Sequence, residues 1–105
     1  MISIDPGPFT VLVVEDQALV RMDAVSCVEE AGYLALAVGN AEDALQALRE
    51  NRTIDALFTD IRMPGSFDGL ALARRAREEW PDMPIVVTSG EAKPAPGELP
   101  WRYHH

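Results

Sequence analysis

The chain has 105 residues, of which 48% are hydrophobic and 25% charged, a composition typical of one globular domain and not of a disordered segment. Seventeen acidic residues against nine Lys and Arg give a formal net charge of −8, which disfavours direct binding to nucleic acid or to an anionic membrane. The start of the chain lacks a signal-peptide pattern, and no apolar run is long enough to span a bilayer. We therefore expect a single, small, cytoplasmic domain over residues 1–105.

The first half of the chain alternates strand and helix patterns. Apolar and β-branched residues over 10–14 predict a strand buried on both faces. Asp16 stands where a helix N-cap is expected, and apolar residues then recur at helical spacing as far as Gly32, which suits the left-handed position after a helix. Residues 33–38 predict a second strand, and the apolar spacing over 41–51 predicts a second amphipathic helix.

The second half continues the alternation. Residues 54–59 predict a third strand, a helix follows over about 69–80, and residues 85–88 predict a fourth strand. Three prolines and a glycine between residues 91 and 100 argue against a full-length fourth helix, and residues 101–105 have the pattern of the start of a fifth strand. This alternation predicts an α/β fold, a doubly wound parallel sheet with helices on both faces and a binding crevice at the carboxyl ends of the strands.

Acidic side chains stand at those carboxyl ends. Glu15 and Asp16 follow the first strand, and Asp60 follows the third. If these strands are neighbours, three carboxylates meet in a small volume, which favours a hard divalent cation such as Mg²⁺. Asp16 and Asp60 are the expected direct ligands, and Glu15 is expected to act through water. An ionised Asp is also a competent nucleophile toward a phosphoryl group, whose oxygens the hydroxyl of Ser89 after the fourth strand can contact.

Each of these residues also has a purely structural interpretation. Asp16 alone is more often a helix cap, Glu15 a solvated surface carboxylate, and Asp60 a turn residue. Ser89 before Gly90 is equally natural as a plain turn. The joint pattern, with acids after strands one and three and a hydroxyl after strand four, favours the functional interpretation.

Four segments together resemble the response-regulator receiver domain of two-component signalling. They are Val11-Leu-Val-Val-Glu-Asp16, Asp60-Ile-Arg-Met-Pro-Gly65, Asp68-Gly69-Leu70 and Pro84-Ile-Val-Val-Thr-Ser-Gly90. The resemblance covers about residues 9–90. It implies the flavodoxin-like receiver fold, a five-stranded parallel sheet of order 2-1-3-4-5.

The resemblance also implies a role for each site residue. Asp60 matches the phosphoacceptor, which takes a phosphoryl group from a sensor histidine kinase or a phosphotransfer protein. Asp16 matches the direct Mg²⁺ ligand, Glu15 its acidic neighbour, and the main-chain carbonyl of Arg62 the third protein ligand. Ser89 matches the hydroxyl that moves toward the phosphoryl group and couples it to a surface for a downstream protein target. Such a domain is a signalling switch that catalyses only its own phosphorylation and dephosphorylation.

The sequence departs from the family pattern near its end. The loop between Asp60 and Asp68 is one residue longer than in many members, the fourth helix is expected to be shortened, and the last helix is missing. The usual Lys-Pro after strand five is absent, so we expect a chain truncated before it. If Lys-Pro followed the last residue directly, Tyr103 would occupy the aromatic switch position. Lys93, near the start of the loop after strand four, is a poor substitute for the missing lysine.

Two other functions stay open at this stage. The missing lysine permits a pseudo-receiver, a module that binds partners without phosphorylation. A small Mg²⁺-dependent phosphatase with Asp60 as its nucleophile is a third hypothesis, although a chain this short leaves little room for a substrate pocket or a cap segment.

Overall fold

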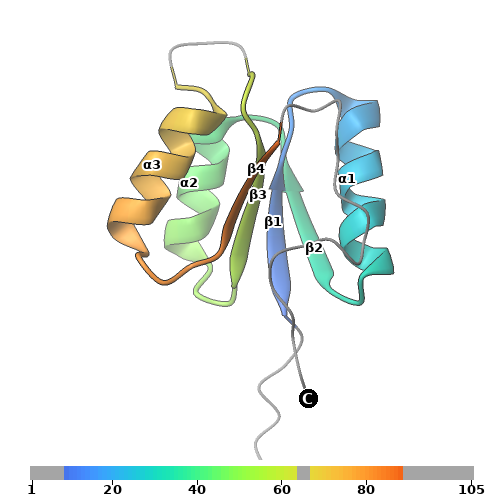
Figure 1. The fold of residues 1–105 in the computed structure, drawn as a ribbon, viewed down its shortest axis with the longest axis horizontal. Coiled ribbons are helices and arrows are strands. Elements are labelled where there is room, and N and C mark those ends of the chain that lie inside the picture. Colours follow the sequence, from blue (N-terminus) through green and yellow to red (C-terminus); the bar gives the residue numbers. More distant parts are fainter. Residues whose placement is uncertain (1–8, 64–66, 89–105) are drawn as a thin grey trace, which may run out of the picture.

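The computed structural model describes residues 9–63 and 67–88. Within these ranges no helix has the length and apolar character needed to cross a membrane. Strands and helices alternate strictly along the chain (Figure 1) in the order β1 (Thr10–Val14), α1 (Ala18–Glu30), β2 (Leu34–Val38), α2 (Ala41–Glu50), β3 (Ala56–Asp60), α3 (Gly69–Glu79) and β4 (Ile85–Thr88).

The four described strands form one parallel sheet in the order β2-β1-β3-β4. Helix α1 covers one face of the sheet, and α2 and α3 cover the other (Figure 1). The predicted α/β class is therefore confirmed, together with the first four positions of the predicted strand order. The expected fifth strand at 101–105 and the shortened fourth helix at 91–100 lie outside the described residues.

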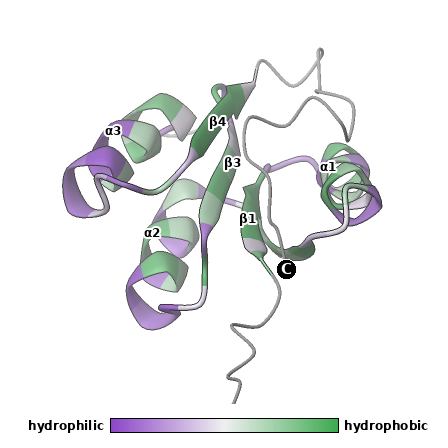
Figure 2. Cartoon of the chain, turned by 60° about the horizontal axis from the view of Figure 1, so that its bottom comes forward, coloured by the Kyte–Doolittle hydropathy of each residue, from purple (hydrophilic) through white to green (hydrophobic). Residues whose placement is uncertain are grey.

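Neighbouring residues of the central strands pack into separate hydrophobic clusters on the two faces of the sheet. Val11 and Val13 of β1 contact the cluster under α1, whereas Leu12 and Val14 contact the cluster under α2 and α3. All five residues of β1 are buried, as are all five of β3. Helices on both faces require strands that are apolar on both sides. Figure 2 shows the result, with hydrophobic strands between helices whose hydrophilic residues face outward.

The helix starts differ in how they are capped. The side chains of Asn40 and Asp68 cap α2 and α3 by accepting hydrogen bonds from backbone N–H groups three residues further on. The expectation that Asp16 caps the first helix is wrong, because α1 begins later, its N-cap is Gln17, and no side chain caps it. The backbone N–H of Gln17 instead donates to Oε1 of Glu15 at 3.1 Å. Asp16 thus carries no capping role.

Element ends match the expectations to within two residues. The third strand runs over 56–60 instead of 54–59, because Asp55 is held outside it by two hydrogen bonds with the backbone of Thr10, each of 2.8 Å. Asp60 is therefore the last residue of β3 itself. Gly32, with a φ of 95°, confirms the predicted left-handed residue after α1.

Candidate functional site

Three carboxyl groups meet at the carboxyl end of the sheet. Glu15 and Asp16 follow β1, and Asp60 ends β3, the strand that pairs with β1 in parallel so that Val14 lies opposite Thr59. One carboxylate oxygen from each of the three acids lies within 4.8 Å of the others. The predicted convergence of these side chains is therefore present in the structure.

Glu15 is the most constrained of the three acids. Only 2% of its surface is exposed, so the view of it as a solvated surface carboxylate is wrong. Its Oε1 accepts the Gln17 N–H, while the buried Oε2 has no hydrogen-bond partner in the described structure. Burial, followed by contact with the carboxyl groups of Asp60 and Asp16, raises the pKa of Glu15 to about 7, despite the opposing effect of the Gln17 N–H.

Asp60 is held by hydrogen bonds on both sides of its peptide unit. It is 7% exposed, and the backbone N–H of Arg62 donates to its Oδ1 at 3.2 Å. The hydroxyl of Thr59 donates to the Asp60 carbonyl at 3.0 Å, and the N–H of Ile61 donates to the carbonyl of Thr88 at 2.8 Å. The carboxylate therefore projects from a fixed strand end into the site.

Gly69 is a site residue to which the sequence alone gave no role. It is the first residue of α3, and a Cβ added there would lie 1.6 Å from the carbonyl oxygen of Asp60 and 3.0 Å from Oγ1 of Thr59. Only a glycine lets the start of α3 pack directly against the backbone of the acceptor strand. The sequence places Gly69 directly after Asp68 but carries no signal for its contact with another element.

Arg21 is a second residue that the sequence reasoning missed. Its Nη1 donates to the main-chain carbonyl of Glu15 at 2.9 Å and lies 3.3 Å from where a Cβ on Gly39 would be. The arginine thus links α1 to the loops that follow β1 and β2. No sequence signal identifies this contact, because Arg21 is six residues from Glu15 and looks like an ordinary helix-surface cation.

The other predicted site residues divide into those that are described and those that are not. The backbone of Arg62 lies beside the Asp60 carboxylate, as the 3.2 Å hydrogen bond shows. Thr88, the last residue of β4, is opposite Asp60 in the sheet register. Ser89, Lys93 and Tyr103 lie outside the described residues.

The donor set fits a magnesium ion. All three side chains offer carboxylate oxygens, the ligand type that Mg²⁺ prefers. Two of them are buried side by side, where like charges repel, and no group in residues 9–63 or 67–88 donates a hydrogen bond to Oε2 of Glu15 to offset its burial. A divalent cation bound between these side chains would supply the missing positive charge.

Comparison with known proteins identifies the family. The family model for the response regulator receiver domain matches residues 11–97. The chain belongs to the response regulator receiver family. Among curated relatives, the response regulator receiver protein CpdR of Brucella abortus (strain 2308) is 39% identical over 82 residues, which cover 78% of this receiver domain and 67% of CpdR. The structural relative from Sinorhizobium medicae WSM419, a response regulator receiver protein, is 39% identical with a TM-score of 0.71 and covers 76% of this chain and 64% of that one.

The same kind of domain also occurs in longer proteins. The sensor kinase CckA of Brucella abortus (strain 2308) is 34% identical over 90 residues, which are 85% of this receiver domain. The matched part is only 9% of the length of CckA. The receiver domain therefore corresponds to a small portion of that relative.

Proposed function

We propose that this receiver domain accepts a phosphoryl group on Asp60 from a sensor histidine kinase or a phosphotransfer protein in the cytoplasm, in a reaction that requires Mg²⁺. The observation that carries the proposal is the convergence of Glu15, Asp16 and Asp60 within 4.8 Å at the carboxyl end of the sheet. Membership of the receiver family supports it. The net charge of −8 supports a protein donor and target and disfavours direct contact with nucleic acid or a membrane.

Asp60 is the proposed nucleophile. An oxygen of its carboxylate attacks the phosphorus of a phosphohistidine and forms a new O–P bond as the P–N bond breaks. The electron pair of that bond goes to the leaving imidazole nitrogen, which takes up a proton from water. The product is an acyl phosphate on Asp60. Hydrogen bonds from Arg62 and Thr59 fix the residue in place, which favours in-line attack.

The surrounding acids are the proposed magnesium ligands. Asp16, Asp60 and the main-chain carbonyl of Arg62 would hold the ion, and Glu15 would contact it through water. When bound, Mg²⁺ offsets the negative charge of the carboxylates and of the phosphoryl oxygens. A bound cation would favour the charged form of Glu15, whose buried Oε2 has no hydrogen-bond partner among the described residues.

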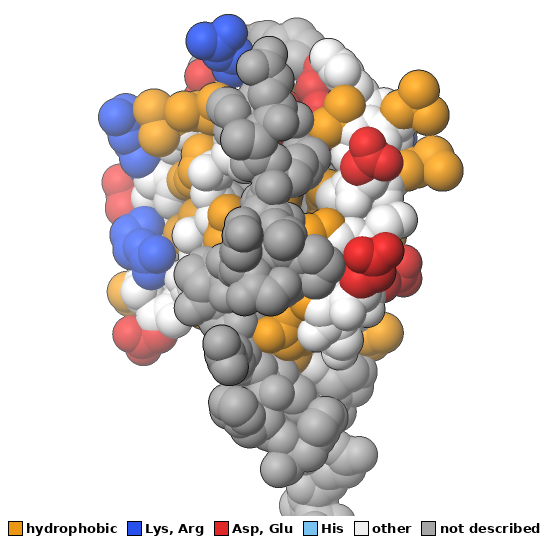
Figure 3. Space-filling view, turned by 45° about the vertical axis from the view of Figure 1, so that its right-hand side comes forward, with side chains coloured by type: hydrophobic (Ala, Val, Ile, Leu, Met, Phe, Trp, Pro, Cys, Tyr) orange, Lys and Arg blue, Asp and Glu red, His pale blue; other side chains and the backbone are white. Residues whose placement is uncertain are grey.

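The first turns of α1 offer a contact surface for the donor protein. Leu19 and Met22 are 77% and 64% exposed, and α1 begins two residues after Asp16. Hydrophobic and acidic side chains lie together on the right of Figure 3, the side on which α1 lies. Because Leu19 and Met22 are three and six residues after Asp16, we assign them to the proposed contact with the donor protein.

The output would be carried by two residues beyond the described ranges. The added phosphoryl charge is proposed to draw in the hydroxyl of Ser89 and thereby change a partner-binding surface near Tyr103. The downstream target is expected to be a protein.

The test is labelling by acetyl phosphate, a small phosphodonor, followed by intact mass spectrometry. Wild type should gain the mass of one phosphoryl group in the presence of Mg²⁺ and none in EDTA, whereas Asp60→Asn should gain none. Asp55→Asn, at the opposite end of β3, is the matched control and should be labelled like wild type. Equal labelling of wild type and Asp60→Asn would contradict the proposal, as would labelling unaffected by EDTA.

A further inference from the structure

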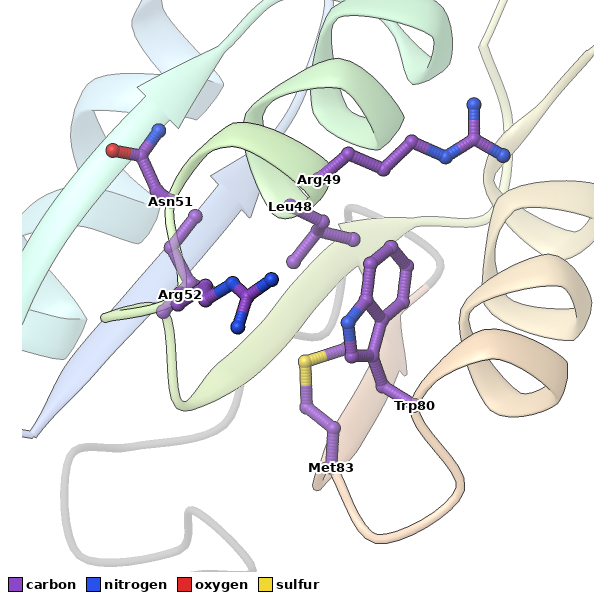
Figure 4. A pocket seen from close by; sticks show the side chains of 7 residues that line it. Leu48, Arg49, Asn51, Arg52, Trp80 and Met83 are labelled. Carbon is purple, nitrogen blue, oxygen red and sulfur yellow. The ribbon is translucent and has the colours of Figure 1, made fainter.

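A hollow lies at the opposite end of the sheet from the acidic site. It encloses about 390 Å³ and lies where α2 and α3 end and where β3 and β4 begin. Its apolar walls come from four side chains and its polar rim from three (Figure 4), together Leu48, Ile54, Trp80 and Met83 with Arg49, Asn51 and Arg52. A volume of this size is within the range of small-molecule sites.

The polar groups that face this hollow are hydrogen-bond donors. Figure 4 shows the guanidinium of Arg52 directed toward the space beside Met83, and the Nε1 edge of Trp80 turned toward the same space. Within the described part of the chain neither of these two groups has a hydrogen-bond partner. Arg49 extends away toward α3, where it pairs with Glu79 at 2.8 Å. Among the described side chains that line the hollow, the guanidinium of Arg52 and the indole N–H of Trp80 are therefore the donors available to a ligand.

We propose that this hollow binds a small carboxylate with an apolar body. A guanidinium and an indole N–H are both donors, so their complement is an anion with acceptor oxygens, and a carboxylate matches the planar guanidinium. The walls formed by Leu48, Ile54 and Met83 would cover the apolar part of such a ligand.

The shape and surroundings of the hollow favour a free small molecule. The hollow is bounded by the ends of two helices, whereas a bound peptide would need an extended groove or an open strand edge. Acidic side chains are present nearby, but Asp55, Glu79 and Asp82 line an adjoining hollow, which shares Ile54, Trp80 and Met83 with this one. Within the described residues no acidic side chain lines the hollow of Arg52.

The proposed ligand is independent of the phosphoacceptor chemistry. The hollow begins before the first residue of β3 and Asp60 is the last, so the five-residue strand separates the two by roughly 15 Å. Failure of labelling at Asp60 therefore leaves this proposal standing, and failure of ligand binding leaves the phosphoacceptor proposal standing.

The experiment titrates the full chain with phenylacetate and, as the uncharged match, with phenylacetamide. Binding is followed by the indole N–H signal of Trp80 in ¹H–¹⁵N spectra, which Trp101→Phe assigns. We expect phenylacetate to saturate with a Kd on the order of 1 mM, because such a small ligand gains little binding energy, and phenylacetamide to bind about tenfold more weakly. N-acetyl-Gly-Phe, a peptide end with the same carboxylate and ring, should bind no better than phenylacetate.

Two arginine variants locate the anion. Arg52→Gln should weaken phenylacetate binding about tenfold or more while leaving phenylacetamide binding unchanged. Arg74→Gln, an exposed arginine of α3 that does not line the hollow, should bind like wild type. Equal binding of the acid and the amide, or unchanged binding by Arg52→Gln, would overturn the proposal. Tighter binding of the peptide would overturn its assignment to a free small molecule.

Discussion

At the carboxyl end of the sheet Glu15 and Asp60 are buried side by side, whereas at the amino end Asp55 is exposed and accepts a 2.8 Å hydrogen bond from the backbone of Thr10. Both ends carry acids on or beside the central strands. At the amino end the chain itself satisfies the acid. At the carboxyl end the part of the chain that the structure describes leaves Oε2 of Glu15 buried without a hydrogen-bond partner.

Arginines show a related contrast. Arg77 donates to the carbonyls of Pro81 and Met83 at 2.7 and 3.0 Å and closes the turn between α3 and β4. Arg21 makes the same kind of contact with the Glu15 carbonyl, but the loop it holds carries the acidic cluster. At the amino end the acid Asp55 and the arginine Arg77 are both satisfied by the backbone. At the carboxyl end the buried acids carry the charge that a cation would stabilise, which is where local rules are expected to be broken for function.

The largest loss of stability is expected from a methyl group added at the carboxyl end of the sheet. Gly69→Ala places a Cβ 1.6 Å from the Asp60 carbonyl oxygen, so α3 or β3 must move, and we expect a loss of about 3 kcal/mol in the free energy of unfolding. Gly32→Ala is the matched control. It meets no atom within 4 Å but must adopt a φ near 95°, so it should lose only about 1 kcal/mol. Urea titration compares them, and equal losses would show that α3 is not anchored at the site.

The two glycines also show how far the sequence could predict this fold. Gly32 follows an apolar helix pattern, so its left-handed conformation could be read from local chemistry alone. The role of Gly69 depends on a contact with Asp60, nine residues earlier and on another element, and no local pattern reports such a distance.

The same reasoning applies to the site. Glu15, Asp16 and Asp60 could be brought together in advance, because strand ends in a parallel sheet share one edge. The burial of Glu15 and the contact of Arg21 with its carbonyl depend on the path of the loop after β1. This loop is one residue longer than expected, because the N-cap position of α1 is Gln17 and not Asp16.

Removing an arginine at either end separates stability from metal binding. Arg77→Ala loses the charged hydrogen bonds that one Nη1 donates to two carbonyls, and Arg21→Ala loses one such bond, so each should lose about 2 kcal/mol of stability. Only Arg21→Ala should weaken Mg²⁺ binding, about threefold or more, because it frees the loop that carries Glu15 and Asp16. Calorimetric titration with Mg²⁺ measures this.

The direction in which Arg21→Ala changes the Mg²⁺ affinity is informative, because the positive charge of Arg21 also repels Mg²⁺. If charge repulsion outweighed positioning, Arg21→Ala would bind Mg²⁺ more tightly than wild type, and the positioning role would be rejected. Arg21→Lys retains the charge and a donor, so it should recover part of the affinity.

Neutralising Glu15 should change the pH dependence of stability. Its pKa is raised to about 7 in the folded state, so between pH 4.5 and 7 the native protein holds a proton that the unfolded chain releases. Stability without metal should therefore fall as the pH rises through this window. Glu15→Gln should remove the fall and raise the Tm at pH 8 in EDTA by several degrees. Thermal melts from pH 5 to 8 measure the pH dependence of the Tm and its value at pH 8. If the Tm of the variant fell with pH as steeply as that of wild type, Glu15 would not be the group responsible.

The matching substitution at the amino end should lower the stability of the protein, whereas Glu15→Gln should raise it. Asp55→Ala removes the acceptor of the Thr10 N–H and should destabilise the protein by about 1 kcal/mol at pH 8. If Glu15→Gln also destabilised the protein, the carboxyl end would be as internally satisfied as the amino end, and the comparison would fail.

The smallest effect is expected from the surface ion pairs of the amino end. Glu79 contacts Arg49 at 2.8 Å and Arg75 at 3.3 Å, and the hydrogen bond from Arg49 lowers its pKa, so any stabilisation is present above its ordinary pKa and is lost as the pH falls below it. These side chains are well exposed, so water and salt screen the pairs. Glu79→Gln should leave the urea midpoint unchanged at physiological salt and lower it slightly at low salt. A loss as large as that of Arg77→Ala would mean that surface charge, and not hydrogen bonding to the backbone, stabilises this end of the sheet.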